Sequence, residues 1–242
     1  MKVTLVSYTQ GAVELLLFTK ATRLRLSPGL MDEIKSWPED RKAKELAYVA
    51  QTIPSSWEFV DYVFLVGGVS RAYTHQQVRT RTGSYAQQAM RVVDVSTCLE
   101  YVPTARNQEN PAAMAVIGET LVAVQAGYAK LLALGQLVED ARGLLPTNVS
   151  TNIVCKFNLR AFADLVRSRI GGRSQDEYQQ VVKAMVAEVL RVHPWAEQFL
   201  FQFKRDAFKE LEDFAEQEYG GDILKKGRLL KIADVLRKNL KK

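Results

Sequence analysis

The run WEFVDYVFLVGG, residues 57–68, constrains the fold more than any other stretch of this chain. Aromatic and β-branched residues in such a run, closed by two glycines, are typical of a largely buried strand. The stretches MKVTLVSYTQ at residues 1–10 and NVSTNIVCKF at residues 148–157 predict two further strands. A mixed or antiparallel sheet is therefore expected within the fold.

Most of the remaining chain shows helical periodicity. Helices are predicted over residues 12–25, 39–51, 111–134, 159–170 and 176–190, in a short segment through Arg142, and from Trp195 onward. Asn158 is placed to cap the helix that follows it, and Gly135 to end the longest helix. A helix face is expected to pack in the core, formed by Tyr178, Val182, Met185 and Val189. The predicted fold class is α+β, a helix-rich single domain.

Composition predicts a cytoplasmic globular protein that holds no metal. The chain has 242 residues, of which 47% are hydrophobic, enough for a core of its own. No apolar run is expected to be long enough to cross a membrane, and the N-terminus is interpreted as a strand rather than a signal peptide. Cys98 and Cys155 form no CxxC or zinc-ligand spacing. His75 and His193 are too few for a tightly held transition metal.

The net charge of +6 belongs to the C-terminal tail. Residues 222–242 hold eight Lys or Arg against two Asp, which is +6, so residues 1–221 sum to zero. Leu229, Ile232, Ala233, Leu236 and Leu240 recur there at helical spacing, which predicts a basic amphipathic helix. We expect a main domain at 1–221 and this helix at 222–242. The helix is interpreted as docking on the protein or a neighbouring subunit, with RNA or an anionic surface as the alternative.

The stretch HQQVRTRTGSYAQQAMR, residues 75–91, combines three arginines with four glutamines and has no carboxylate. Arg79 and Arg81 would diverge on a regular helix, so a shared anionic ligand requires a turn or helix end, which Gly83 makes easy. Arginine binds phosphate oxygens through two parallel hydrogen bonds and stays charged. The composition therefore indicates phosphate binding, the alternative being arginines that are solvated or paired with carboxylates.

The arginine stretch resembles the signature of the flavin-dependent thymidylate synthases. That pattern is Arg-His-Arg, a short turn ending in Ser, a Glu or Gln, a second Ser and a closing Arg, and it is matched by Arg79, Arg81, Ser84, Gln87 and Arg91. Further stretches resemble the family in the same order along the chain: PSSWEF, ARGLLP, NLR, RSRIGGRSQDEY, HPW and GGDIL. Together they cover nearly the whole sequence.

The resemblance implies a fold, a reaction and a site. The fold would be that of the flavin-dependent thymidylate synthases, assembled as a homotetramer with active sites at subunit interfaces, and neither a membrane nor a nucleic acid is expected as a partner. FAD would be the cofactor, with NADPH and methylenetetrahydrofolate as co-substrates for methylation of dUMP at C5. The implied FAD-binding residues are Ser55, Arg79, Thr80, Arg81, Gln87, Asn158, Arg160 and Asp164. The implied nucleotide-binding residues are Gln76, Arg79, Gln87, Gln88, Ala89, Arg91, Arg142 and Arg169, with Arg169 also catalytic.

The sequence departs from the family pattern at several of these positions. Thr80 stands where the pattern has histidine, Ala89 where it has the second serine, and Asp164 where it has asparagine, while Arg173 replaces another histidine. Such changes leave the substrate open. Another uracil nucleotide such as UMP, a hydroxymethylation, or a noncatalytic protein that binds nucleotides or RNA are the alternatives.

The remaining candidates for a nucleophile or a base are interpreted as structural. Neither Cys98 nor Cys155 stands in a setting that favours a thiolate. His193, beside Pro194 and Trp195, is expected to end a helix. His75 precedes the arginine stretch and is a minor candidate for proton transfer.

Overall fold

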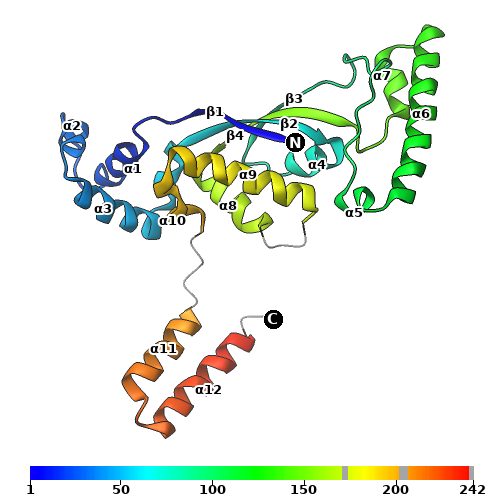
Figure 1. Cartoon of the computed structure of the whole chain (residues 1–242). Coiled ribbons are helices and arrows are strands. Elements are labelled where there is room, and N and C mark those ends of the chain that lie inside the picture. Colours follow the sequence, from blue (N-terminus) through cyan, green and yellow to red (C-terminus); the bar gives the residue numbers. More distant parts are fainter. Residues whose placement is uncertain (171–173, 202–206, 240–242) are drawn as a thin grey trace. The chain divides into compact units, whose positions relative to one another are not determined.

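Four strands form the sheet of the computed structural model, in the order β1-β2-β4-β3 (Figure 1). They span Lys2–Tyr8 (β1), Asp61–Ser70 (β2), Ser84–Gln87 (β3) and Ser150–Asn158 (β4). All three strand pairs are antiparallel. The run predicted as a buried strand lies between β1 and β4, so both of its edges are paired.

The structure describes residues 1–170, 174–201 and 207–239. They belong to two compact units, Met1–Phe201 and Gln202–Lys242. This boundary differs from the one expected after residue 221, because α11 (Ala207–Tyr219) packs against α12 (Ile223–Asn239) and both form the second unit. The basic helix predicted from residue 222 is α12. Arg173 and Leu240, named above, lie outside the described residues.

Two helices cover one face of the sheet, α8 (Leu159–Arg169) and α9 (Asp176–Val192) (Figure 1). Alternate residues of β4 turn toward them and are buried: Thr151, Ile153, Cys155 and Phe157. The helices meet this face with Phe162, Leu165 and Val166 from α8 and with Tyr178, Val182, Met185 and Val189 from α9. Burial of each Val, Leu or Phe side chain stabilises the fold by about 1.5–3 kcal/mol. The core face predicted for α9 is thus confirmed.

A cap fixes the corner between β4 and α8. The Asn158 side chain accepts a hydrogen bond from the backbone N–H of Ala161 at 2.8 Å, as the sequence predicted. The backbone N–H of Leu159 donates to the carbonyl of Val60 at 2.7 Å. These bonds fix the direction in which α8 leaves the sheet and therefore the position of its last residue, Arg169.

Short helices pack where β1 ends and β2 begins (Figure 1). They are α1 (Ala12–Ala21), α2 (Leu30–Lys35), α3 (Glu39–Thr52), the 3-10 helices η1 (Pro54–Phe59) and η3 (Pro194–Ala196), and α10 (Glu197–Leu200). The strand expected from residue 57 begins at Asp61, because Pro54 starts η1 and the buried Trp57 indole donates to the carbonyl of Val49 at 3.2 Å. Helix α2 was not predicted from the sequence.

The rest of the first unit holds α4 (Arg71–Gln77), α5 (Ala105–Gln108), α6 (Pro111–Ala133), α7 (Val138–Ala141) and the 3-10 helix η2 (Arg142–Leu144). Gly135, with a φ of 84°, follows the end of α6 as predicted. Tyr128 is the residue of α6 that is buried, while Val122 is 71% exposed.

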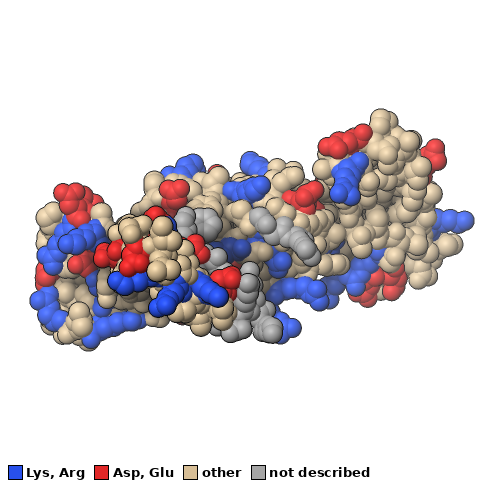
Figure 2. Space-filling model, turned by 90° about the horizontal axis from the view of Figure 1, so that it is seen from below, with Lys and Arg blue, Asp and Glu red and all other residues tan. Residues whose placement is uncertain are grey.

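The composition of α6 contradicts the expectation that no apolar run is long enough to cross a membrane. With 23 residues and a mean hydropathy of 1.3, α6 is long and apolar enough to cross a membrane, although one such helix is weak evidence of a span. Its charged residues are Glu119 and Lys130. Figure 2 accordingly shows few charged side chains over the α6 end of the first unit.

The second unit is a helical hairpin. Ala215 of α11 and Ala233 of α12 are buried between the helices, and Glu216 pairs with Lys226. The predicted apolar stripe of α12 is therefore partly covered by α11, while Ile232 and Leu236 stay about half exposed, at 57% and 49%.

The turn before β3 leaves no room for a side chain at Gly83. A methyl group there would overlap the ring of Phe157 and lie 2.6 Å from the Tyr85 hydroxyl. Phe157 is buried, and the Tyr85 hydroxyl is held by the carbonyl of Thr80. We expect Gly83→Ala to lower the free energy of unfolding, measured by urea denaturation, by about 1–3 kcal/mol.

Gly143→Ala is the control, because a methyl group at Gly143 meets no atom within 4 Å. Its free energy of unfolding should stay within about 0.5 kcal/mol of the wild type. Equal stability of the two variants would contradict the close packing at Gly83.

Candidate functional site

The arginine-rich stretch folds as the end of α4 followed by a tight turn. The backbone N–H groups of Arg79 and Thr80 donate to carbonyls one turn earlier, at 3.2 and 3.0 Å, and Gly83 N–H donates to Thr80 at 3.1 Å. This confirms the predicted helix end and turn. Arg79 and Arg81 are exposed and form no ion pair with a described residue. Their charges are therefore free to bind an anion.

A small cluster beneath this turn joins two of the predicted site residues. The Thr80 hydroxyl lies 3.3 Å from the Tyr178 hydroxyl, and the Thr80 carbonyl accepts from Tyr85 at 2.7 Å. The guanidinium carbon of Arg169 lies 4.8 Å from the centre of the Tyr178 ring. The Nε of Arg169 is buried and has no hydrogen-bond partner among the described residues. Such a donor needs an acceptor, which a bound ligand can provide.

Glutamine side chains tie the same region to the elements around it. Gln76 Nε2 donates to Gln175 Oε1 at 2.6 Å, which joins α4 to the residue before α9. Gln87 Nε2 donates to the Thr74 hydroxyl at 2.7 Å. The Gln88 side chain accepts from Asn152 of β4 at 2.9 Å. These amides hold the site without adding charge beside the arginines.

A second group of predicted residues gathers at the start of α8. Arg160 donates to Glu58 of η1 at 2.6 Å, Ser55 accepts from Arg23, and Asp164 pairs with Arg167. These contacts are exposed, and exposed ion pairs contribute only about 0–1 kcal/mol, so a ligand can replace them. Asn158 keeps its amide N–H groups free of a described partner while its oxygen caps α8.

Within one chain, the length of α8 separates Arg169 from the residues at the start of this helix. Asn158 and Arg160 lie at the start of α8, whereas Arg169 is its last residue. Eleven helical residues separate the two ends by about 16 Å. Tyr178 links Arg169 to Thr80, whereas no described contact links Arg169 to Asn158 or Arg160.

The last predicted residues lie on exposed segments. Ala89 and Arg91 follow β3, and Arg142 in η2 donates to the carbonyl of Glu139 at 3.0 Å. Arg71, half-buried at the start of α4, is a cation that the sequence analysis missed. Burial, and then the charge of Arg142, lower the pKa of Arg71. A signal was present, because Arg71 opens the polar segment that continues into the arginine stretch.

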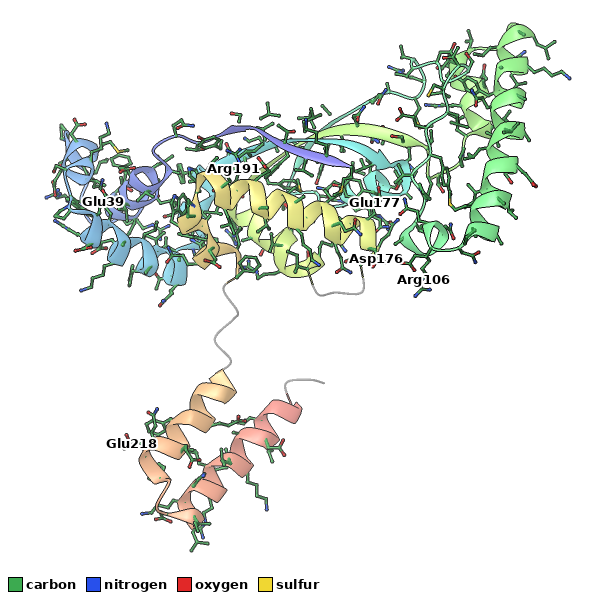
Figure 3. All side chains as sticks on the ribbon, in the orientation of Figure 1. Glu39, Arg106, Asp176, Glu177, Arg191 and Glu218 are labelled. Atoms are coloured by element: carbon green, nitrogen blue, oxygen red, sulfur yellow. The ribbon has the colours of Figure 1, made fainter. Side chains whose placement is uncertain are left out.

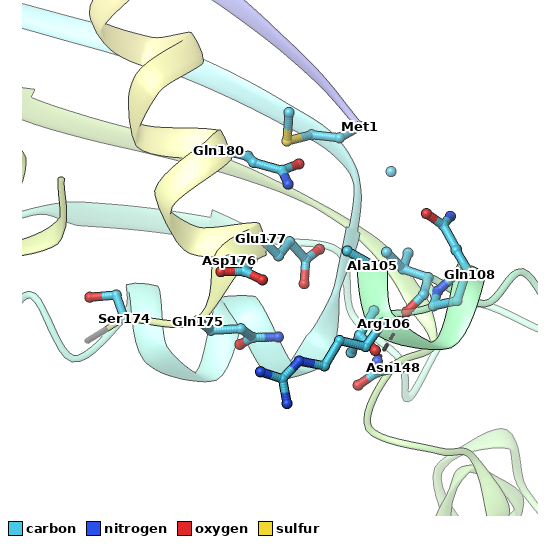
Figure 4. A pocket seen from close by; sticks show the side chains of 14 residues that line it. Met1, Ala105, Arg106, Gln108, Asn148, Ser174, Gln175, Asp176, Glu177 and Gln180 are labelled. Atoms are coloured by element: carbon cyan, nitrogen blue, oxygen red, sulfur yellow. Dashed lines mark hydrogen bonds between the residues drawn. The ribbon is translucent and has the colours of Figure 1, made fainter. Parts of the chain in front are cut away.

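An open cavity of about 500 Å³ lies beside the cluster (Figure 4). Arg106 of α5 faces it from one side, and Gln175, Asp176 and Glu177 from the other. The Glu177 carboxylate accepts from the backbone N–H and the hydroxyl of Ser70, at 2.7 and 2.5 Å. The six arginines implied to bind ligands, at 79, 81, 91, 142, 160 and 169, do not line this cavity. The arginines implied to bind FAD and the nucleotide are thus not gathered around this cavity within one chain.

Cys155 and His193 have structural settings. Burial raises the pKa of the Cys155 thiol to about 12, so this group stays protonated. His193 follows the end of α9, as predicted, and its Nδ1 lies 3.0 Å from the Tyr62 hydroxyl. Its ring is buried and packs against Trp195. His75 is exposed.

Comparison with known proteins decides the family. A family model described as "Thymidylate synthase complementing protein" matches residues 4–195. A flavin-dependent thymidylate synthase of Nitratidesulfovibrio vulgaris is 33% identical over 175 residues, which cover 65% of this chain and 71% of that protein. Another, of Sulfurisphaera tokodaii, is 30% identical over 203 residues, 80% of this chain and 75% of that protein. The chain belongs to the flavin-dependent thymidylate synthase family.

Solved structures confirm that the fold is that of the flavin-dependent thymidylate synthases, which are methyltransferase-type enzymes. The UMP/dUMP methylase PolB from Streptomyces cacaoi, bound with 5-Br dUMP, superposes with a TM-score of 0.71 and 17% identity, over 84% of this chain and 96% of that chain. Thymidylate Synthase X from Helicobacter pylori, with FAD and dUMP, gives a TM-score of 0.63 and 20% identity, over 84% and 97%. The match to the family model ends before α11 and α12.

The buried His193 predicts a loss of stability in acid. Burial lowers the pKa of His193 below its ordinary value of 6.5, so the unfolded chain takes up the proton first as the pH falls. The stability that neutral His193 contributes is present above that ordinary value and is lost below it. His193→Gln keeps an acceptor for Tyr62 but does not titrate. We expect its melting temperature to change less than that of the wild type between about pH 7 and pH 5.

His75→Gln is the matched control, because His75 is exposed. Its melting temperature should follow the wild-type dependence on pH. Parallel curves for His193→Gln and the wild type would contradict this account of the buried imidazole.

Proposed function

We propose that the protein transfers a one-carbon unit from methylenetetrahydrofolate to C5 of a uridylate nucleotide, with bound FAD and with NADPH as reductant. Conversion of dUMP to dTMP is the leading reaction. Family membership and the relatives named flavin-dependent thymidylate synthase support it. The observation that carries it is the half-buried Arg169, whose Nε lacks a described partner and whose guanidinium lies against the ring of Tyr178, the residue that contacts Thr80 in the arginine turn.

The donors of this chain suit FAD, which carries a diphosphate. Arg79 and Arg81 have no described carboxylate partner, and the exposed pair of Arg160 with Glu58 can be exchanged for a phosphate. We infer that FAD is held by Ser55, Arg79, Thr80, Arg81, Gln87, Asn158, Arg160 and Asp164. When bound, FAD supplies the reducing equivalents that turn the transferred carbon into a methyl group.

The nucleotide is assigned to the neighbouring set of polar residues. We infer that Gln76, Arg79, Gln87, Gln88, Ala89, Arg91, Arg142 and Arg169 surround it. Arg169 is the residue placed at the uracil ring, where negative charge grows as C5 becomes nucleophilic. A guanidinium that the fold already holds in place stabilises this charge by a few kcal/mol without reorganising. Arg169 forms no ion pair with a described carboxylate, so its positive charge is not neutralised by one.

The active site is proposed to be shared between subunits of a homotetramer. Arg160 and Arg169 lie near opposite ends of α8, and a second chain can bring the two ends into one site. The apolar, exposed α6 is a surface that further copies of the chain can bury. Burial against copies, rather than in a bilayer, accounts for its composition and agrees with a cytoplasmic enzyme.

UMP is the second candidate substrate. The printed description of PolB as a UMP/dUMP methylase, together with its TM-score of 0.71, favours this possibility. Ala89, which replaces the second serine of the family pattern, removes one hydroxyl from the nucleotide-binding segment. Turnover of dUMP and UMP measured in parallel distinguishes the two.

Replacement of Arg169 tests the proposal. The wild type should quench added FAD fluorescence and convert dUMP, UMP or both. Arg169→Ala should bind FAD as the wild type does but lose turnover by about 100-fold or more, because the charge on the uracil ring is no longer stabilised. Normal turnover by this variant would refute the role of Arg169.

Arg191→Ala is the control for removing a helical arginine. Arg191 is exposed and paired with Glu188, and it lies at the end of α9 opposite Asp176 and Glu177 (Figure 3). Its turnover should equal that of the wild type. A wild-type protein that binds no FAD and oxidises no NADPH would overturn the proposed function and favour a noncatalytic nucleotide or RNA binder.

A further inference from the structure

Tyr178 connects the two sides of the proposed site. It lies in the first turn of α9 and is fully buried. Its hydroxyl meets the Thr80 hydroxyl at 3.3 Å, on the side assigned to FAD. Its ring lies 4.8 Å from the guanidinium carbon of Arg169, on the side assigned to the nucleotide. Tyr178 thus contacts one residue assigned to FAD through its hydroxyl and one residue assigned to the nucleotide through its ring.

The ring of Tyr178 is the partner that the structure describes for the Arg169 guanidinium, and it orients this group. Arg169 ends α8, forms no ion pair with a described residue, and has a buried Nε without a described partner. A guanidinium over an aromatic face is held by the ring quadrupole, which does not neutralise the cation as a carboxylate would. Arg169 can therefore be fixed in direction and still act on developing negative charge.

The Tyr178 ring is itself fixed. Tyr73 packs edge-on against it with 5.2 Å between ring centres. The Tyr73 hydroxyl donates to Gln77 at 3.2 Å, and the nearby Gln76 is joined to Gln175. These contacts hold α4 against the start of α9. Thr80 and Arg169 therefore both contact a tyrosine whose position is fixed.

We propose that Tyr178 is a positioning residue that sets Thr80 through its hydroxyl and Arg169 through its ring. The proposal rests on the function proposed above. Thr80 replaces the histidine of the family pattern, and its short hydroxyl is held by Tyr178 on one side, while its carbonyl is held by Tyr85. The hydroxyl contact governs FAD binding, and the ring contact governs the reaction of the nucleotide.

Two substitutions separate the two contacts. Tyr178→Phe keeps the ring and removes the hydroxyl, so the dissociation constant for FAD should rise roughly 2- to 10-fold while kcat at saturating FAD is unchanged. Tyr178→Leu removes both the ring and the hydroxyl, so its kcat/KM for the nucleotide should be roughly 2- to 30-fold lower than that of Tyr178→Phe. The measurements are FAD fluorescence quenching, dUMP binding to the FAD-loaded protein, and kcat and KM for dUMP and UMP.

Tyr62→Phe is the matched control, because it removes the hydroxyl of another fully buried tyrosine, which lies 3.0 Å from His193 Nδ1 rather than at the proposed site. Its FAD and nucleotide constants should equal those of the wild type. A purely structural Tyr178 would lower the melting temperature of Tyr178→Leu and leave the constants of its folded fraction unchanged, which would overturn the proposal. If Tyr178→Leu does not fold, Tyr178→Phe decides: weaker FAD binding supports the proposal, and wild-type binding overturns it.

The wild type separates this proposal from the proposed function. A wild type that binds neither FAD nor dUMP overturns both. A wild type that binds and converts a nucleotide, with Tyr178→Phe and Tyr178→Leu matching all of its constants, overturns only the positioning role.

Discussion

The antiparallel pairing of β2 with β4 is the constraint on which the site depends. Asp61 pairs with Asn158 at one end of the two strands, and Ser70 with Ser150 at the other. β2 continues into α4 and the arginine turn, while β4 continues into α8 from the opposite end. Because α8 folds back beneath the sheet, its last residue, Arg169, arrives under the turn that carries Thr80.

Charge explains why so many contacts in this region are neutral. The arginines of the turn are exposed without a described carboxylate partner, and Arg169 is held by an aromatic ring. Glutamine and tyrosine side chains provide hydrogen bonds that leave the positive field intact. This is the electrostatic setting that a phosphate-bearing cofactor and an electron-rich pyrimidine require. Asn158 and Arg160 lie at the other end of α8 from Arg169, and we propose that a neighbouring subunit completes the set.

The sequence predicted the parts of the fold that local patterns determine. The buried run at β2, the cap at Asn158 and the glycine after α6 follow from side-chain chemistry within a few residues, and all are present. The boundary expected at residue 221 followed a change in charge, whereas the structure divides after Phe201, because α11 packs on α12 and belongs to the same unit.

The candidate site was predicted only in part for a similar reason. The arginine turn follows from its sequence, but the link from Thr80 through Tyr178 to Arg169 joins three separate elements. Periodicity along α9 correctly identified Tyr178 as a core residue. It could not show that the Tyr178 hydroxyl meets Thr80 and that the ring meets Arg169.

Complementation between subunits tests most directly whether the site is shared. Arg160→Ala and Arg169→Ala, carried on chains with different affinity tags, are co-expressed, and the hybrid assemblies that carry both tags are purified. If Arg160 of one chain and Arg169 of another complete the same site, the hybrids regain methylation of dUMP or UMP that both parent variants lack. Hybrids as inactive as their parents would contradict a site assembled from neighbouring subunits.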